Sequence, residues 1–181
     1  MQPIDQATLV NSILAATSEV FEVMLNLPVT PGPAYRTPPN SDPTEGVVAL
    51  VGLAGQWVGT GILQCDTGMA RVLFAHLLGV EEAPGGEGVD GEVLDAVAEI
   101  ANMIIGNVKN TLEEHLGPMG MSIPTVVFGR NFTTRGGGSE PWTIVPFTCA
   151  GSRLLVKVCL THCPEAAESR RGAAVLRGFT I

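Results

Sequence analysis

A single long helix dominates the apolar pattern of this chain. It opens at Val89-Asp90 and continues to about Leu116, where Gly117-Pro118 ends it. Apolar side chains recur along one side at helical spacing, which is typical of a helix that packs against a core. At about 100° per residue, the side opposite Asp95 holds Val93, Val97, Ile100, Ile104, Val108 and Thr111.

The rest of the chain alternates between shorter helices and hairpin-connected strands. The first 27 residues predict an amphipathic helix, and residues 67–78 predict a second, which Asp66 or Thr67 can cap and Gly79 can end. Strands are predicted over residues 47–54, 57–64, 122–128, 142–149 and 153–160. Helices combined with hairpin-connected strands indicate an α+β fold of two layers.

The domain organisation follows from length and proline content. A chain of 181 residues is close to one domain, so we expect a single domain over residues 1–181. Residues 28–45 contain six prolines and predict an extended surface loop without regular structure. Residues 164–181 are expected to be a C-terminal extension, for which we predict a short helix followed by a final strand near Ala173 to Thr180.

Charge and apolar content exclude several partners. The net charge is −8 and the basic residues are scattered, whereas binding to a nucleic-acid backbone needs clustered cations. The longest apolar stretch, Val93 to Val108, is interrupted by four polar side chains that a membrane helix would not carry: Asp95, Glu99, Asn102 and Asn107. A secretory signal begins with a basic segment, but no basic residue precedes Arg36. We therefore expect a cytoplasmic protein that binds neither nucleic acid nor membrane.

The polar side of the long helix carries a continuous stripe. Within about 40° of Asp95 on the helical wheel lie Glu99, Asn102, Gly106, Lys109 and Glu113. Any surface helix has a solvated polar face, so a stripe alone does not indicate function. However, Asn is a mediocre helix former, and glycine in a helix costs about 1 kcal/mol relative to alanine. Gly106 also leaves room for another surface to approach. The stripe is therefore either a solvated face or a contact site around Glu99 and Asn102.

The run from Asp95 to Asn107 resembles the signature helix of the CheC/CheX/FliY family of chemotaxis phosphatases. That signature has an Asp or Ser, a Glu four residues later, an Asn three residues after that, and a Pro a little over twenty residues further on. The matching residues are Asp95, Glu99, Asn102 and Pro124. Residues 19–25, 144–147 and 155–160 also look like CheX-type sequence, so the resemblance covers about residues 5–27 and 46–162.

The number of motif copies makes the chain CheX-like rather than CheC-like. CheC-type members carry a second Glu-x-x-Asn on the N-terminal helix, where this chain has Glu22 with Asn26 displaced by one residue. The resemblance implies a CheX/CheC-like two-layer fold, with a mostly antiparallel sheet packed against long helices. It also implies a homodimer joined through its sheets.

The same resemblance implies hydrolysis of the aspartyl phosphate on a CheY-type response regulator. Asn102 would orient the attacking water, and Glu99 would pair with the active-site lysine of the regulator. Asp95 and Gly106 would have supporting roles. The divalent Mg²⁺ of the reaction would belong to the regulator, so no cofactor or metal of the chain's own is expected.

Two alternatives remain open at the level of sequence. Cys159, His162 and Cys163 form a Cys-x-x-His-Cys run, but a structural zinc site needs four ligands and no second pair stands at zinc-finger spacing. The stronger alternative is a non-catalytic binding or scaffold module that recognises a phosphorylated response regulator or a flagellar switch component. Both functional hypotheses use the same stripe, and catalytic turnover distinguishes them.

Overall fold

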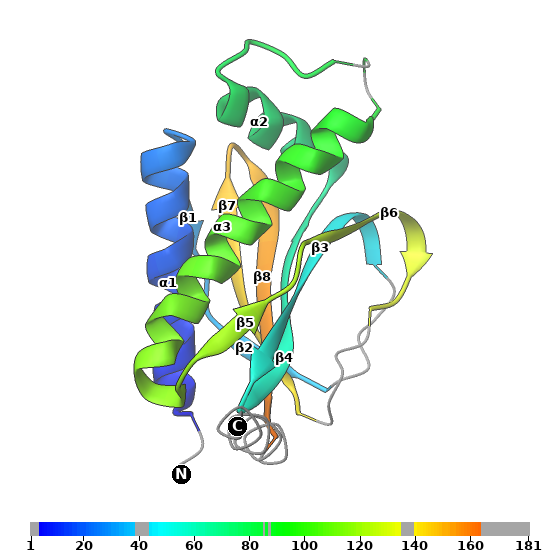
Figure 1. The fold of residues 1–181 in the computed structure, drawn as a ribbon. Helices are drawn as coiled ribbons and strands as arrows, with labels where there is room; N and C mark the ends of the chain where they lie inside the picture. The colour runs from blue at the N-terminus through cyan, green and yellow to red at the C-terminus, as the bar shows by residue number, and fades with distance from the viewer. Residues whose placement is uncertain (1–3, 39–43, 85, 87, 135–139, 164–181) are drawn as a thin grey trace, which may run out of the picture.

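The structure is a computed structural model and describes residues 4–38, 44–84, 86, 88–134 and 140–163 (Figure 1). The helix and strand predicted within residues 164–181 lie outside this range. The helices are α1 (Gln6–Glu19), α2 (Thr67–Leu78) and α3 (Gly91–Leu116), and a π-helical turn η1 (Val20–Met24) extends α1. The strands are β1 (Thr30–Pro31), β2 (Tyr35–Thr37), β3 (Thr44–Gly55), β4 (Trp57–Cys65), β5 (Met119–Met121), β6 (Thr125–Phe132), β7 (Trp142–Cys149) and β8 (Ser152–His162).

The strands form one antiparallel sheet whose central order is β1-β7-β8-β4-β3-β5, with β2 also on β7 and β6 also on β3. The helices lie together on one face of this sheet (Figure 1). The main core fills the space between the two layers and combines fully buried side chains such as Ile13, Leu73 and Ile104 with sheet residues such as Val51 and Val156. The predicted α+β two-layer fold is confirmed.

Local capping signals set the helix boundaries as predicted. The Asp66 Oδ1 atom accepts a hydrogen bond from the Met69 amide at 2.7 Å, and Gly79 ends α2 in the left-handed conformation at φ +65°. The Asp90 Oδ1 atom accepts a bond from the Val93 amide at 3.0 Å and starts α3. These bonds satisfy amides that the first turn of a helix leaves without intrahelical partners.

The prediction of an irregular loop over residues 28–45 is wrong in part. β1 and β2 both pair with the outer side of β7, and β3 already begins at Thr44. Proline is tolerated here because an edge strand needs hydrogen bonds on one side only. The Gly32 amide supplies such a bond, to the Pro146 carbonyl at 2.8 Å.

Two smaller predictions, one of a strand and one of a buried residue in α3, differ from the structure. The strand predicted over residues 122–128 begins only at Thr125, as β6, and an additional short strand, β5, precedes it; Ser122 to Pro124 lie between the two and pair with neither ladder. At the end of α3, Thr111 is exposed and Leu112 is fully buried in its place. The Thr111 hydroxyl donates to the Asn107 carbonyl at 3.2 Å instead of entering the core.

Close contact between α3 and the sheet depends on a glycine of β4. A Cβ atom at Gly61 would lie 2.5–2.7 Å from three side-chain carbons of Ile105, which is itself fully buried. Only glycine therefore allows α3 to approach β4 at this point. Gly61 thus sets how closely the helix that bears the polar stripe packs on the sheet.

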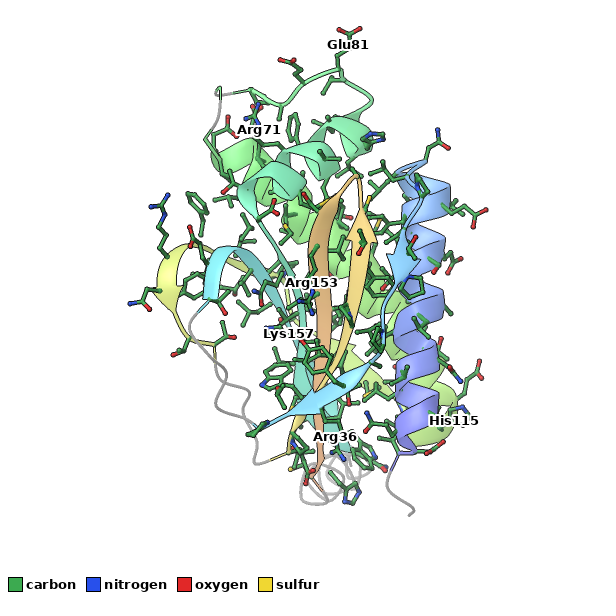
Figure 2. The ribbon with its side chains drawn as sticks, turned by 180° about the vertical axis from the view of Figure 1, so that it is seen from behind. Arg36, Arg71, Glu81, His115, Arg153 and Lys157 are labelled. Atoms are coloured by element: carbon green, nitrogen blue, oxygen red, sulfur yellow. The ribbon has the colours of Figure 1, made fainter. Side chains whose placement is uncertain are left out.

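The opposite face of the sheet has a second, smaller cluster made of Val48, Ile62, Trp142, Ile144 and Cys159. In Figure 2, where the molecule is seen from behind, this face is turned toward the viewer and carries Arg153 and Lys157 of β8. Lys157 is only 5% exposed, and desolvation by burial lowers the pKa of its ammonium. Alternate residues along a strand point to opposite faces of the sheet, so β8 contributes some side chains to the main core and others, such as Lys157, to the outer face.

Candidate functional site

The orientation of α3 about its own axis is fixed by its buried side. Val93, Val97, Ile100, Ile104 and Val108 are all 0% exposed, as the periodicity predicts. A side-chain bond to the neighbouring helix adds to this, since Asn107 Nδ2 donates to Glu19 Oε2 of α1 at 3.2 Å. The polar stripe consequently faces away from the core.

The side chains in the C-terminal half of the stripe make polar contacts within the molecule. Lys109 Nζ lies 2.9 Å from Glu113 Oε2, and Glu113 Oε1 accepts a hydrogen bond from the Met119 amide at 2.7 Å. The bonds from Lys109 and Met119 hold the pKa of Glu113 below its ordinary value. These contacts tie the end of α3 to the start of β5.

Gly106 belongs to the same internal contact. A Cβ atom there would lie 3.6 Å from Met121 Cε, an ordinary van der Waals distance, and the residue is half-buried. The close approach expected at Gly106 is thus made by β5 of the same chain.

The N-terminal half of the stripe differs from the C-terminal half in the contacts that its side chains make. Asp95 and Glu99 are exposed and Asn102 is half-buried, and all three lie within two turns of α3. Within the described part of the chain, their side chains make no hydrogen bond or ion pair. Glu99 and Asn102, three residues apart, are neighbours on one helix face. The structure therefore presents a carboxylate and a carboxamide side by side on a rigid helix, both available to an external partner.

These two groups have defined chemical capacities. A carboxylate pairs with a cationic side chain, and an amide can donate to and accept from a water molecule without acting as a base. Neither group borders the cavity of about 620 Å³ that lies between α1, β2, β4, β7 and β8. An open helix face is better suited to a protein surface than to a small molecule.

A second feature beside the stripe escaped sequence reasoning. Ser122 joins the β5–β6 connection to β3 through its amide, which donates to the Gly52 carbonyl at 2.9 Å, and its Oγ atom, which accepts from the Gly52 amide at 2.9 Å. The hydroxyl donates in turn to the Ile123 carbonyl at 2.8 Å. Pro124, the last residue of the motif, comes directly after Ile123. The motif spacing could have drawn attention to this segment, but only the structure shows what holds it.

The structure does not assemble the possible zinc ligands. Cys159 belongs to the cluster on the outer face of the sheet, where its thiol donates to the Glu140 carbonyl at 3.3 Å. His162 packs on the opposite face, against Trp57 at 5.1 Å between ring centroids. Burial raises the pKa of the Cys159 thiol, which disfavours the thiolate that zinc binds. No group of three metal-ligating side chains gathers anywhere in the described residues.

Comparison with known proteins identifies the family. The sequence profile of the family described as chemotaxis phosphatase CheX matches residues 47–148, more than half of the chain. The chain belongs to the CheX family. This match spans β3 to β7 and contains both α3 and the β5–β6 connection. The CheX-type assignment made from Glu99 and Asn102 is confirmed at the level of the family.

Solved structures agree with this membership. Chemotaxis protein CheX from Vibrio vulnificus is 29% identical, with a TM-score of 0.73 over 84% of this chain and 99% of that one. A CheC-like superfamily protein from Shewanella sp. PV-4 is 26% identical, with a TM-score of 0.73 over 85% and 97%. A third structure, the CheX–CheY–BeF₃–Mg²⁺ complex from Borrelia burgdorferi, contains a chain 26% identical to this one, with a TM-score of 0.70 over 87% and 99%.

Two further results complete the comparison. A search of curated proteins finds no match to this CheX-family chain. Among the helices that the structure describes, none is long and apolar enough to cross a membrane.

Proposed function

We propose that this chain hydrolyses the aspartyl phosphate of a CheY-type response regulator. The observation that carries the proposal is the free Glu99–Asn102 pair, exposed to half-buried on the rigid α3 of a CheX-family protein. The complex of CheX with CheY, beryllofluoride and Mg²⁺ from Borrelia burgdorferi supports a regulator as the partner.

In the proposed reaction, the Asn102 amide holds a water molecule in line with the phosphorus atom. An acyl phosphate is already activated, so positioning and charge stabilisation account for most of the acceleration. The water oxygen forms a bond to phosphorus, the bond from phosphorus to the aspartyl oxygen breaks, and inorganic phosphate and a free carboxylate result. Mg²⁺ belongs to the regulator in this proposal, and the chain contributes no metal or cofactor.

Glu99 has a docking role in the proposal. Its carboxylate lies one turn before Asn102 and pairs with the active-site lysine of the regulator, which sets the register of α3 on the partner. Asp95, one turn earlier on the same face, adds negative charge to this surface. Gly106 has a supporting role through its contact with Met121 of β5, which comes just before the β5–β6 connection.

Replacement of Glu99 by glutamine is expected to weaken the complex by roughly fivefold to tenfold, because an exposed charge pair contributes about 1 kcal/mol or less and a partly desolvated one somewhat more. Raising the salt concentration should weaken the wild-type complex and affect the variant less, since charge pairs are screened within about 10 Å at 0.1 M. Titration calorimetry with an activated receiver domain measures both. Equal affinities at every salt concentration would remove the ion pair from the proposal.

A binding module without catalysis is the second candidate, and it uses the same free pair. A catalyst releases many equivalents of phosphate when it is present well below the regulator concentration. A module that only binds would protect the phosphorylated regulator or leave its lifetime unchanged. Measuring phosphate release at a ratio of one chain to a hundred regulators separates the two.

We also propose that the chain is a homodimer joined through its sheet. Among the described strands, β6 pairs only with β3, so the outer edge of its eight residues has free backbone groups that a second copy can pair with. We expect sedimentation to give the mass of two chains. Phe128, 48% exposed on β6, should be covered by the partner, so Phe128→Asp should shift the mass toward one chain. A monomeric wild type would contradict this proposal.

A further inference from the structure

We propose that Ile123 is the apolar anchor with which this chain holds the receiver domain of its response regulator against Glu99 and Asn102. The inference rests on the proposed function and deepens it. It adds a specific apolar contact to a docking surface that the motif defines only by polar groups.

Among the described residues, Ile123 is the most exposed large apolar side chain at 86%, and Val23 follows at 71%. At this position isoleucine contributes almost nothing to the stability of the free chain. Burying such a side chain at an interface removes apolar surface from water and therefore stabilises the complex. The residue therefore has more to contribute to a complex than to the fold.

The backbone that carries Ile123 is held at several points. Glu113 binds the Met119 amide, Met121 packs beside Gly106, and Ser122 makes two hydrogen bonds with the Gly52 backbone. A Cβ atom at Gly52 would lie 3.3 Å from the Ser122 Oγ atom, so this contact too is close. An anchor that is already ordered loses little conformational entropy on binding.

The position of Ile123 relative to α3 connects it with the stripe. β5 begins at the C-terminal end of α3 and, with the segment that leads to β6, runs back along the helix toward its middle (Figure 1). Met121 is beside Gly106, and Asn102 lies one helical turn further in the direction in which the chain proceeds. Ile123, two residues after Met121, lies further along the same direction, toward the free half of the stripe.

Together these residues form a two-part docking surface. The polar part consists of Asp95, Glu99 and Asn102, and the apolar part is the Ile123 side chain. Interfaces commonly combine one or a few buried apolar anchors with a charged rim that sets orientation. The negative rim beside the anchor favours a partner with a cationic group next to an apolar depression. A receiver domain that presents its active-site lysine to Glu99 meets the first condition, whereas a second copy would place like charges opposite each other.

The test compares Ile123→Ser with Ile123→Leu and with Val23→Ser, a matched exposed residue on η1. The probe is each CheY-type receiver domain of the source organism, loaded with beryllofluoride and Mg²⁺ for binding and phosphorylated for turnover. Ile123→Ser should raise both Kd and KM about tenfold or more and leave kcat within about twofold. Ile123→Leu and Val23→Ser should match the wild type.

The outcomes separate the inference from the proposed function. Unchanged Kd and KM for Ile123→Ser, in a wild type that binds and hydrolyses, would overturn the anchor and leave the phosphatase proposal standing. A change in the sedimentation mass of the free Ile123→Ser chain would also overturn it, because Ile123 would then be a contact between copies. A wild type that neither binds nor dephosphorylates any receiver domain would refute the proposed function, and the anchor with it.

Discussion

Alanine at position 102 is expected to reduce phosphate release from a phosphorylated receiver domain by at least about a hundredfold, the usual cost of losing the alignment of a reacting group. The folded state should be almost unaffected. Asn102 makes no side-chain hydrogen bond within the described residues, and alanine has the higher helix propensity. We expect a change in unfolding free energy within about 0.5 kcal/mol. Phosphate release and thermal unfolding measure the two effects independently.

Asn110→Ala is the matched control for this prediction. Asn110 is an exposed asparagine on the same helix, two turns after Asn102 and outside the free half of the stripe. It should keep full activity and show a similar small gain in helix propensity. A folded Asn102→Ala that turns over substrate at the wild-type rate would overturn the catalytic role. An inactive Asn102→Ala that still binds the activated receiver domain would support water positioning rather than docking.

The second large effect is expected at Gly61, far from any predicted motif residue. Gly61→Ala introduces a Cβ atom into the space of Ile105, a branched and fully buried side chain that cannot turn away into solvent. Overpacking of this kind costs about 1–3 kcal/mol. For a chain of this size each kcal/mol lowers the melting temperature by about 2–4 °C. Calorimetry or circular dichroism measures the shift. Because α3 is displaced, turnover should fall as well.

Gly106→Ala provides the control of opposite sign. The added Cβ atom meets only Met121 Cε, at 3.6 Å, and a glycine within a helix costs about 1 kcal/mol relative to alanine. This variant should be as stable as the wild type or more stable by up to about 1 kcal/mol. If Gly61→Ala and Gly106→Ala had the same effect on stability, the close packing of α3 on β4 would not be the reason for glycine at position 61.

Much of the fold could be predicted because the relevant signals are local. Caps such as Asp66 and Asp90 act on amides three residues away, and the apolar period of α3 depends only on helix geometry. The family assignment depended on one such local pattern, the spacing of Glu99 and Asn102. Their catalytic and docking roles stay predictions, because no partner is present to show what they contact.

Contacts between distant segments could not be predicted in this way. β1 and β2 form only because β7 offers its outer edge to a proline-rich segment that has no strand pattern of its own. Likewise, nothing around Gly61 in the sequence indicates that Ile105 will lie above it, and nothing around Gly52 indicates Ser122. Packing and hydrogen bonds across 40 to 70 residues depend on the arrangement of the whole sheet.

The polar stripe shows both kinds of information in one helix. The sequence by itself determined that Asp95, Glu99, Asn102, Gly106, Lys109 and Glu113 share a face, because helical periodicity is an intrinsic property of the backbone. Only the tertiary structure decided that this face has two halves. β5 binds Glu113 and packs on Gly106, whereas Glu99 and Asn102 form no side-chain hydrogen bond or ion pair within the described residues. Periodicity places side chains around one axis, but their partners come from chain segments that the period does not describe.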